Sequence, residues 1–344
     1  MRILFVIGNG FDKNLGLSTG YTEFYNWYTS TPSSCDAVRQ LKESIYGQYQ
    51  NWSDLELGIG EYTENISNLD DSIEIYDDIV IGMQDYLSIE VEKYIYDTSC
   101  KETLLNDIFH PEKFLRSNEA NSIFNNFNRN NEWSASVISF NYTDTFERLL
   151  GNPNLPLQTD FKDEGPRKLS NIIHIHGYIG ERMILGVNDV SQIANKELCE
   201  YPKFIFRYIK SENNKTYQLN HEQDCQDLIT QADVICLFGL SLGLTDKSWW
   251  NRIATRIYNS SSSRLIIFDY RPNFKLQGNL GPKYQGYVED VKDKFLKAAG
   301  FPLNSGFRNQ IYVAFTPSIF DFNLSKVQSV THNARLQSHI QRRR

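Results

Sequence analysis

The sequence predicts a doubly wound α/β fold, in which a parallel sheet carries a large helical insertion. Six short apolar runs each end in polar or glycine-rich residues, helical patterns separate the later runs, and one long stretch contains no clear strand. The runs lie at 1–7, 135–140, 172–175, 234–238, 265–268 and 311–315. Ligands of open parallel sheets bind outside the carboxyl ends of the strands. The recurring polar endings therefore predict one nucleotide-sized site.

Composition narrows the class of protein. The 344 residues suffice for one large domain with an insertion. A net charge of −7 gives no field that attracts a polyanion, so a nucleic-acid partner is not expected. The five cysteines form no C-x-x-C pair, which suits a reducing cytosol. The first apolar run stops at Gly8, and no run approaches the roughly 20 residues that span a bilayer. We expect a soluble cytoplasmic protein without membrane partners.

The N-terminal part of the chain is predicted to contain one strand followed by a helical insertion. An apolar run at 2–7, bounded by glycine, is typical of a strand that is buried on both faces. A helix is predicted at 22–29. Residues 33–130 then carry apolar positions at helical spacing and many acids, with helices expected at 73–96 and 122–128. This stretch is predicted to be a helical layer inserted into the sheet domain.

The alternation of strands and helices resumes after the insertion. Further strands are predicted at 135–140, 171–176, 182–186, 234–238, 264–269 and 311–315. Helices are predicted at 143–150, 246–258, 288–299 and over most of 188–231, with loops at 151–170, 211–215 and 278–286. The pattern divides the chain into a nucleotide-binding sheet domain (1–32 and 131–320), the insertion (33–130) and a C-terminal tail (321–344). The tail ends in Arg342-Arg343-Arg344.

The turn after the first strand reads Gly8-Asn9-Gly10-Phe11-Asp12. Gly8 permits a tight turn, and Gly10 permits the backbone to approach a phosphate or ribose. The turn is half of a dinucleotide fingerprint, since the third glycine is missing at the usual spacing. An ordinary strand-to-helix turn is the alternative interpretation. Its place after the first strand favours ligand binding by all five residues.

Two polar residues follow the predicted strand at 135–140. The amide of Asn141 offers a donor and an acceptor for a sugar hydroxyl or a water molecule. Asn and Asp also favour turns and helix N-caps, and we favour the cap for Asp144. Ligand contact is the second interpretation for Asp144.

His174 and His176 alternate along one strand and therefore face the same side. Such a pair could ligate a metal, but no third ligand is recognisable. We interpret His174 as a satisfied packing residue. His176 stands at the end of the strand beside Gly177, where it could serve as a general base.

A Gly/Ser turn follows the predicted strand at 234–238. The backbone N–H groups of Gly239 to Leu242 and the hydroxyl of Ser241 are predicted to bind phosphate or ribose. Asp246 is a ligand candidate as well, although capping of the next helix by Thr245 or Asp246 is the favoured alternative. In the insertion, Asp54 and Glu56 could reach the cleft, but a solvated helix start is preferred.

Together these motifs resemble the abortive-infection AbiH family of bacterial antiphage proteins. The matching segments are IGNGFD, GLSTGYTEF, WSDLE, SFNYTD, HIHG and GLSLGLTD, which span most of the chain. The resemblance implies an antiviral role. It also implies a homo-oligomer or a partner from the same defence system.

At greater distance, the order of the motifs is similar to that of sirtuin-type, Rossmann-like NAD-binding domains. That resemblance implies NAD as substrate or ligand, no metal, and Asn141 and His176 as the catalytic pair. Asp12 departs from the pattern because it replaces a serine, and 18–24 lack the expected arginine. The zinc-binding cysteines of protein deacylases are also absent, so the resemblance implies hydrolysis of NAD rather than deacylation of protein lysines.

Three hypotheses follow. The first is an antiphage effector that hydrolyses NAD or a related nucleotide at the N-glycosidic bond. The second is a nucleotide sensor without turnover. The third is a metal-dependent nuclease or phosphohydrolase that uses Asp12, Asp144, His174, His176 and Asp246. The first requires that Asn141, His176 and the Gly8–Gly10 turn surround one crevice, covered on one side by the insertion.

Overall fold

We analysed a computed structural model of the chain. The structure describes residues 1–327 apart from 51, 125–130, 160, 162–163, 217–220, 272–280, 316–317 and 323. Most of the predicted tail, including Arg342–Arg344, and part of the predicted loop at 278–286 lie outside the described residues.

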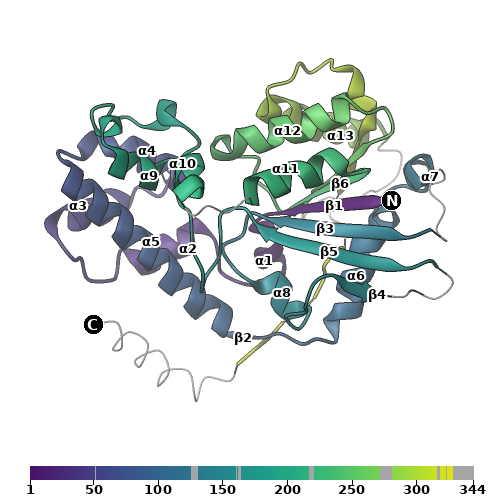
Figure 1. Ribbon diagram of the computed structural model, residues 1–344, viewed down its shortest axis with the longest axis horizontal. Coiled ribbons are helices and arrows are strands. Elements are labelled where there is room, and N and C mark those ends of the chain that lie inside the picture. Colours follow the sequence, from purple (N-terminus) through teal and green to yellow (C-terminus); the bar gives the residue numbers. More distant parts are fainter. Residues whose placement is uncertain are drawn as a thin grey trace.

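A seven-stranded, mostly parallel sheet forms the centre of a mixed α/β fold (Figure 1). Its strands are β1 (Arg2–Ile7), β3 (Trp133–Ser139), β4 (Leu157–Thr159), β5 (Arg167–His174), β6 (Val234–Phe238), β7 (Arg264–Asp269) and β8 (Ile311–Phe315). Their order is β4-β5-β3-β1-β6-β7-β8, and only the pairing of β4 with β5 is antiparallel among these strands. Along the sequence, β3, β4 and β5 are added on one side of β1, and β6, β7 and β8 are then added on the other side.

The carboxyl ends of the central strands lie level with one another. Ile7 of β1 is opposite both Ser139 of β3 and Phe238 of β6, and Ser139 is in turn opposite His174 of β5. Residues that directly follow these strands therefore meet at one edge of the sheet.

Helices cover both faces of the sheet because the strands are apolar on both sides. In β1, Ile3, Phe5 and Ile7 join one core, whereas Leu4 and Val6 join the other. The second core also contains residues of α11 (His221–Gln231), α12 (Lys247–Tyr258) and α13 (Gly281–Ala299), which lie above the sheet in Figure 1. On the opposite face lie α1 (Gly10–Asn14), α6 (Cys100–Phe109) and α8 (Thr145–Leu149).

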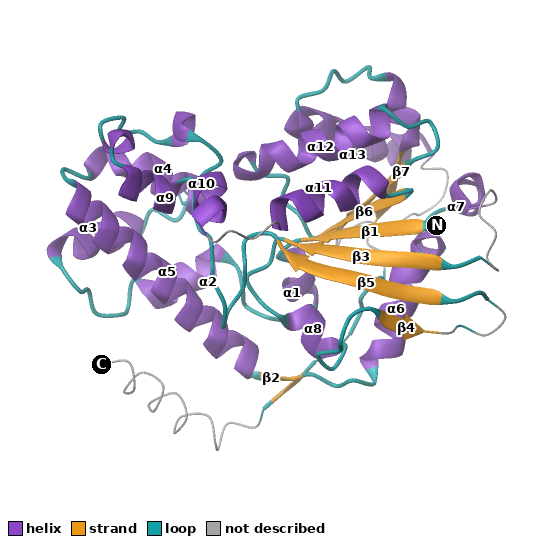
Figure 2. Ribbon diagram, viewed as in Figure 1, coloured by secondary structure: helices purple, strands orange, loops and turns teal. Residues whose placement is uncertain are grey.

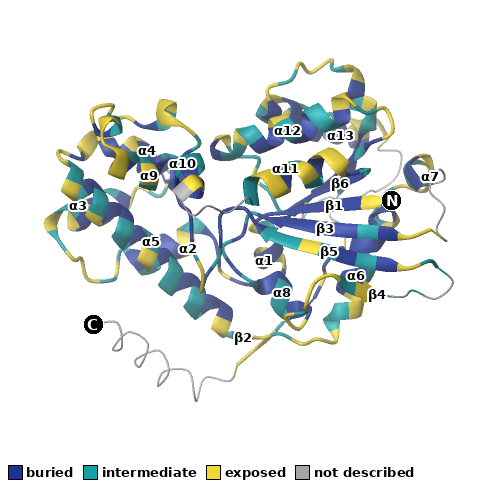
Figure 3. Cartoon of the chain, in the orientation of Figure 1, coloured by how far each residue is buried: buried dark blue, intermediate teal, exposed yellow. Residues whose placement is uncertain are grey.

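A helical lobe stands beside the carboxyl ends of the strands (Figure 2). It contains α2 (Tyr21–Tyr28), α3 (Asp36–Ile45), α4 (Leu55–Tyr62), α5 (Leu69–Glu92), α9 (Pro202–Tyr208) and α10 (Lys210–Thr216). The long helix α5 contacts α2, α3 and α9, and α9 contacts α10. The lobe therefore combines α3 to α5 of the predicted insertion with α2 and with a second segment near residue 210, which the sequence did not indicate, whereas α6 of the insertion packs against the sheet. Figure 3 shows that α5 is buried along one side and exposed along the other.

The remaining elements connect these two parts. Short 3-10 helices lie at η1 (Thr63–Asn65), η2 (Pro111–Phe114), η3 (Val190–Gln192), η4 (Leu198–Glu200), η5 (Leu244–Asp246) and η6 (Gly306–Gln310). Helix α7 (Ser117–Phe124) follows η2, and the short strand β2 (Tyr94–Ile95) pairs with β9 (Ser325–Lys326). This small sheet corrects the expectation that 33–130 contains no strand. None of the described helices is long and apolar enough to cross a membrane.

Four predicted elements are wrong. The connection expected at 151–170 contains β4, and β5 already begins at Arg167. The strand at 182–186 is reduced to one isolated bridge between Gly177 and Met183, because Gly177 and Gly186 adopt positive φ angles that turn the chain. The loop at 211–215 is part of α10, where an ion pair between Lys215 and Glu212 supports the helix. Residues 281–286, expected in a loop, begin α13, since proline is tolerated in a first helical turn.

Candidate functional site

A pocket of about 600 Å³ lies at the carboxyl ends of β1, β3 and β6. Its walls come from the turns that follow these strands, from 19–23 and from the start of α4. Two helices of the lobe also reach it, through Met83 and Leu87 of α5 and through Ser53, Asp54 and Glu56 around the start of α4. The site thus lies between the sheet and the helical lobe.

The pocket brings together eight of the twelve residues predicted for the site. Those in its wall are Gly8, Asn9, Gly10, Asp12, Asn141, Gly239, Ser241 and Asp246. The four that do not line it are Phe11, Asp144, His176 and Leu242.

The two glycine turns hold each other by direct backbone contact. The N–H of Gly10 donates to the carbonyl of Gly239 at 2.8 Å, and the N–H of Gly8 donates to Phe238 at 2.9 Å. A Cβ on Gly10 would lie 2.3 Å from the Cα of Gly239, which itself has a φ of +68°. The contact that requires glycine at position 10 is therefore with Gly239, rather than with the ligand that the sequence suggested.

Phe11 belongs to the core and not to the ligand wall. Its side chain is fully buried, and its ring lies 5.5 Å from that of Phe146 and 5.4 Å from that of Phe320. The prediction of ligand contact by Phe11 is wrong, because the first turn of α1 directs this side chain under the sheet.

Leu242 and Asp144 also have other roles. Leu242 adopts a positive φ of 58° and packs against the second core. Asp144 stands at the N-cap position of α8 but makes no side-chain cap hydrogen bond. Its carboxylate instead accepts a hydrogen bond from Arg148 Nε at 2.7 Å. Neither predicted role of Asp144, helix capping or ligand contact, agrees with the structure.

Asp12 and Asn141 provide buried polar atoms that lack partners. Asp12 is 1% exposed, and its Oδ2 accepts a hydrogen bond from Thr143 Oγ1 at 2.6 Å. Its Oδ1, and the Oδ1 of Asn141, have no partner among the described residues. Burial raises the pKa of Asp12 to about 6, although the hydroxyl of Thr143 opposes this shift. Unpaired buried acceptors are costly, so both atoms are candidates for binding a ligand donor.

His174 is held on both sides of its ring. Nδ1 lies 3.0 Å from the carbonyl oxygen of Asn141, and Nε2 lies 2.8 Å from Glu147 Oε1. Both partners are acceptors, so both nitrogens donate only in the imidazolium form. Burial by itself lowers the pKa of His174, but the Glu147 carboxylate outweighs it and raises the pKa above the ordinary value. The ring is a satisfied packing residue, as predicted.

His176 does not line the pocket with Asn141, as the sequence predicted, and is connected to it only through the carboxylate of Asp246. Its ring is buried, lies 5.3 Å from that of Phe140, and places Nε2 3.1 Å from Asp246 Oδ1. Its Nδ1 has no partner in the described part of the chain. The sequence favoured Asp246 as a side-chain cap of the next helix, and this prediction is wrong. Its carboxylate makes no cap hydrogen bond to α12, because it interacts with His176 instead.

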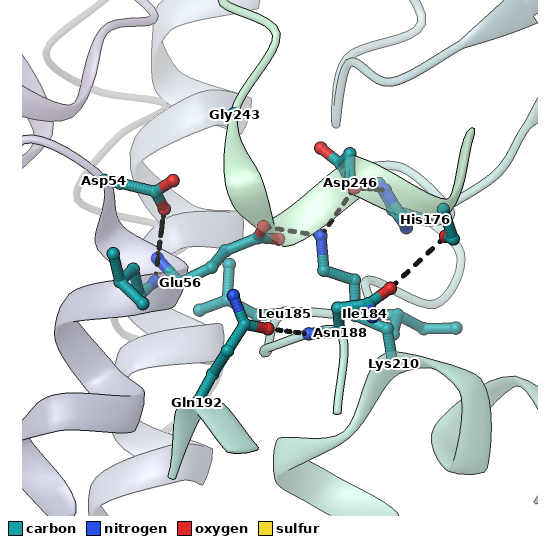
Figure 4. Close-up of polar contacts among 12 residues, drawn as sticks. Asp54, Glu56, His176, Ile184, Leu185, Asn188, Gln192, Lys210, Gly243 and Asp246 are labelled. Carbon is teal, nitrogen blue, oxygen red and sulfur yellow. Dashed lines mark hydrogen bonds and ion pairs between the residues drawn. The ribbon is translucent and has the colours of Figure 1, made fainter. Parts of the chain in front are cut away.

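A buried chain of charges continues from Asp246 into the helical lobe (Figure 4). Lys210 Nζ lies 2.9 Å from Asp246 Oδ1 and 2.5 Å from Glu56 Oε2. The hydroxyl of Tyr142 donates to the other oxygen of Glu56 at 2.8 Å. We call Glu56, Lys210, Asp246 and His176 the charged chain. Sequence reasoning missed Lys210, since its partners lie 154 and 36 positions away and no local pattern marks them.

The pKa values of the two carboxyl groups of the charged chain shift in opposite directions. Burial raises the pKa of Glu56 above its ordinary value, with Lys210 opposing the shift. Burial would also raise the pKa of Asp246, but the Lys210 ammonium and His176 hold it well below its usual range. The pKa of Lys210 rises because the two carboxylates outweigh its burial. Lys210 and His176 therefore favour the ionised form of Asp246.

The start of α4 positions Glu56. The Asp54 carboxylate caps the helix by accepting hydrogen bonds from the backbone N–H groups of Glu56 and Leu57. A helix starts at Asp54 as predicted, but the favoured solvated position is wrong for Glu56, which is buried, and both acids line the pocket. The described part of the chain contains no group of three or more His, Cys, Asp or Glu side chains that could hold a metal ion.

Comparison with known proteins identifies the family. The family model described as bacteriophage abortive infection AbiH matches residues 4–269, which include every residue that lines the pocket. No curated protein matches the chain. Because the match covers more than half of the sequence and contains the complete site, the chain belongs to the bacteriophage abortive infection AbiH family.

Proposed function

We propose that the protein is an antiphage effector that hydrolyses the N-glycosidic bond of NAD or a related nucleotide in this pocket. Family membership suggests defence against phage by abortive infection. The observation that carries the proposed chemistry is the convergence of the turns after β1, β3 and β6 on one pocket with unpaired buried acceptors.

The topology supports a nucleotide ligand. Without the edge strand β4, the order of the six parallel strands is third, second, first, fourth, fifth, sixth along the chain. This is the order of Rossmann-like dinucleotide-binding sheets, which bind their ligands where the strand order reverses. The Gly8–Gly10 turn, Asn141 and the Gly239–Ser241 turn all lie at that position. The pocket volume falls within the range of small-molecule and cofactor sites.

The side chains support a hydrolytic step. The bond between ribose C1′ and the ring nitrogen breaks, and nicotinamide leaves with the bonding electrons as a neutral molecule. A water oxygen then bonds to C1′, and its proton passes to Asp12 and from there to solvent. In this proposal Asn141 holds the ribose or this water through its Oδ1, which has no partner among the described residues. A carboxylate with a pKa of about 6 is suited to accept a proton near neutral pH.

The test is mass spectrometry of small molecules after incubation of the purified chain with NAD, NADP and ribonucleosides. Wild type should release the free base, and Asn141→Ala should lower the rate about 100-fold, within the range for loss of one positioning contact. Asn26→Ala, which changes an exposed amide of α2, should retain the wild-type rate.

Two results would contradict the proposal. Intact NAD and nucleosides after incubation with wild-type protein, also when it is taken from phage-infected cells, would exclude hydrolysis. Tight binding of NAD without release of nicotinamide would instead identify a nucleotide sensor.

A further inference from the structure

We infer that Asp246 is the catalytic residue that stabilises the positive charge developing at the ribose during bond cleavage, with His176 and Lys210 as its positioning residues. This inference rests on the proposed function. It also gives His176 a different role from the general base that the sequence suggested.

The geometry leaves one oxygen of Asp246 available to a ligand. Lys210 Nζ and His176 Nε2 both bind Oδ1, at 2.9 and 3.1 Å. Oδ2 has no hydrogen-bond partner in the described chain, and Figure 4 shows it pointing away from Lys210. The side chain lines the pocket and keeps 18% exposure, whereas that of Lys210 is 7% exposed. Lys210 and His176 therefore fix the carboxylate through Oδ1, and Oδ2 remains available to a ligand.

The charges of the network favour an ionised Asp246. One ammonium group lies between the buried carboxyl group of Glu56 and the partly exposed one of Asp246, so Lys210 compensates only one of two negative charges. His176 donates to Asp246 and not to Glu56, which favours ionisation of Asp246. A carboxylate that is already fixed in place stabilises a cation that forms beside it, because it needs no rearrangement when the charge appears. A ribosyl group carries such a charge when its bond to the base breaks.

His176 is badly placed to act as the base itself. Its Nε2 faces an ionised carboxylate, which accepts hydrogen bonds only, so Nε2 carries the proton. The other nitrogen, Nδ1, is buried, and the ring is not part of the pocket wall. The same hydrogen bond fixes the rotamer of Asp246, as expected for a positioning residue.

The electrons of the step balance without a further reactant. The C1′–N bond electrons leave with nicotinamide, and positive charge spreads over C1′ and the ring oxygen opposite Asp246. Water then supplies the electron pair of the new C1′–O bond and releases its proton to Asp12. Asp246 gains and loses no proton at any stage.

The first measurement is steady-state hydrolysis of NAD by Asp246→Asn. We expect kcat to fall about 100- to 1000-fold with KM changed less than about threefold, because the lost interaction forms only in the transition state. Lys210 still pairs with Glu56 in this variant, so the fold should persist. Asp36→Asn, which neutralises an exposed acid of α3, should have no effect.

The second measurement is affinity for two probes by calorimetry. One is a ribose mimic whose ring nitrogen is protonated, and the other is ADP-ribose, whose terminal ribose carries no charge although its diphosphate is anionic. Asp246→Asn should weaken binding of the cationic mimic about 100-fold and that of ADP-ribose less than threefold. Asp246→Glu keeps the negative charge and should therefore retain the preference for the cationic mimic. This variant tests the proposal if Asp246→Asn does not fold.

His176→Gln separates positioning from base catalysis. Glutamine can still donate to Asp246, so we expect a loss of less than about tenfold and no change in the pH profile of kcat. A loss as large as that of Asp246→Asn, restored by added imidazole, would overturn the assignment. Equal loss of affinity for both probes would overturn it too. If wild type leaves NAD intact, the proposed function fails, whereas the two affinities still decide whether Asp246 selects a cation.

Discussion

The two sides of the pocket are built by different physical means. The strand-end side, formed by Gly8, Gly10, Asp12, Asn141 and Gly239, depends on close backbone contact and on residues that directly follow strands. The charged chain depends on ion pairs between residues far apart in the sequence. The first side tolerates little added volume, and the second tolerates little change of charge. This difference predicts distinct responses to substitution.

Lys210→Met should have the largest effect on stability. It leaves the buried Glu56 and the partly exposed Asp246 without the ammonium group between them, and breaking a buried ion pair costs about 3–5 kcal/mol. Urea unfolding measures the change. Lys215→Met in the same helix removes only an exposed pair with Glu212 and should cost less than about 0.5 kcal/mol. Equal effects of the two substitutions would show that the charged chain does not hold the lobe to the sheet.

Gly10→Val should have the next largest effect. The added Cβ collides with the backbone of Gly239, which cannot rotate away, so the cost should reach the upper end of overpacking, about 3 kcal/mol. Thermal unfolding measures it. Gly286→Ala, at an exposed position of α13 with open space around it, should be neutral or slightly stabilising. A Gly10→Val protein of normal stability would mean that the two turns do not touch.

Asp12→Asn should stabilise the protein while it impairs hydrolysis. The pKa of Asp12 is raised from 3.8 to about 6 in the fold, so its ionisation opposes folding. This cost is absent below about pH 4, grows as pH rises towards 6, and stays constant above that. We therefore expect a gain on the order of 2 kcal/mol at pH 8 and none at pH 3.5.

Unfolding in urea at several pH values tests the Asp12 prediction. Asp290→Asn, on the exposed surface of α13, is the matched control substitution. A loss of stability at pH 8 in Asp12→Asn would show that the carboxylate is well solvated or paired in the native state.

Asp54→Ala should have the smallest effect on stability, about 1 kcal/mol, from loss of the α4 cap. Because Glu56 lies in the same first turn, turnover of NAD should fall as well. Asn68→Ala removes the cap of α5, away from the pocket, and should cost as much stability with no change in turnover. If both variants keep full turnover, the start of α4 does not position the charged chain.

Local sequence patterns predicted the strand-end side of the pocket well. Apolar runs marked β1, β3, β6, β7 and β8, and parallel pairing brings residues after such strands to one edge. Gly8, Asn141 and Gly239 could therefore be placed together from their position after a strand. Phe11 shows the limit of this reasoning, since the sequence does not reveal which residues of a turn point into the core.

The sequence by itself determined the parallel α/β sheet, the helical character of the insertion and the family of the protein. Tertiary structure alone decided that α9 and α10 join the lobe, that Gly10 packs on Gly239, and that Lys210 links Glu56 to Asp246. The physical reason is the sequence separation over which each interaction acts. Periodicity and turn chemistry act between neighbours in the chain, whereas burial and ion pairing depend on which distant segments the packed fold brings together.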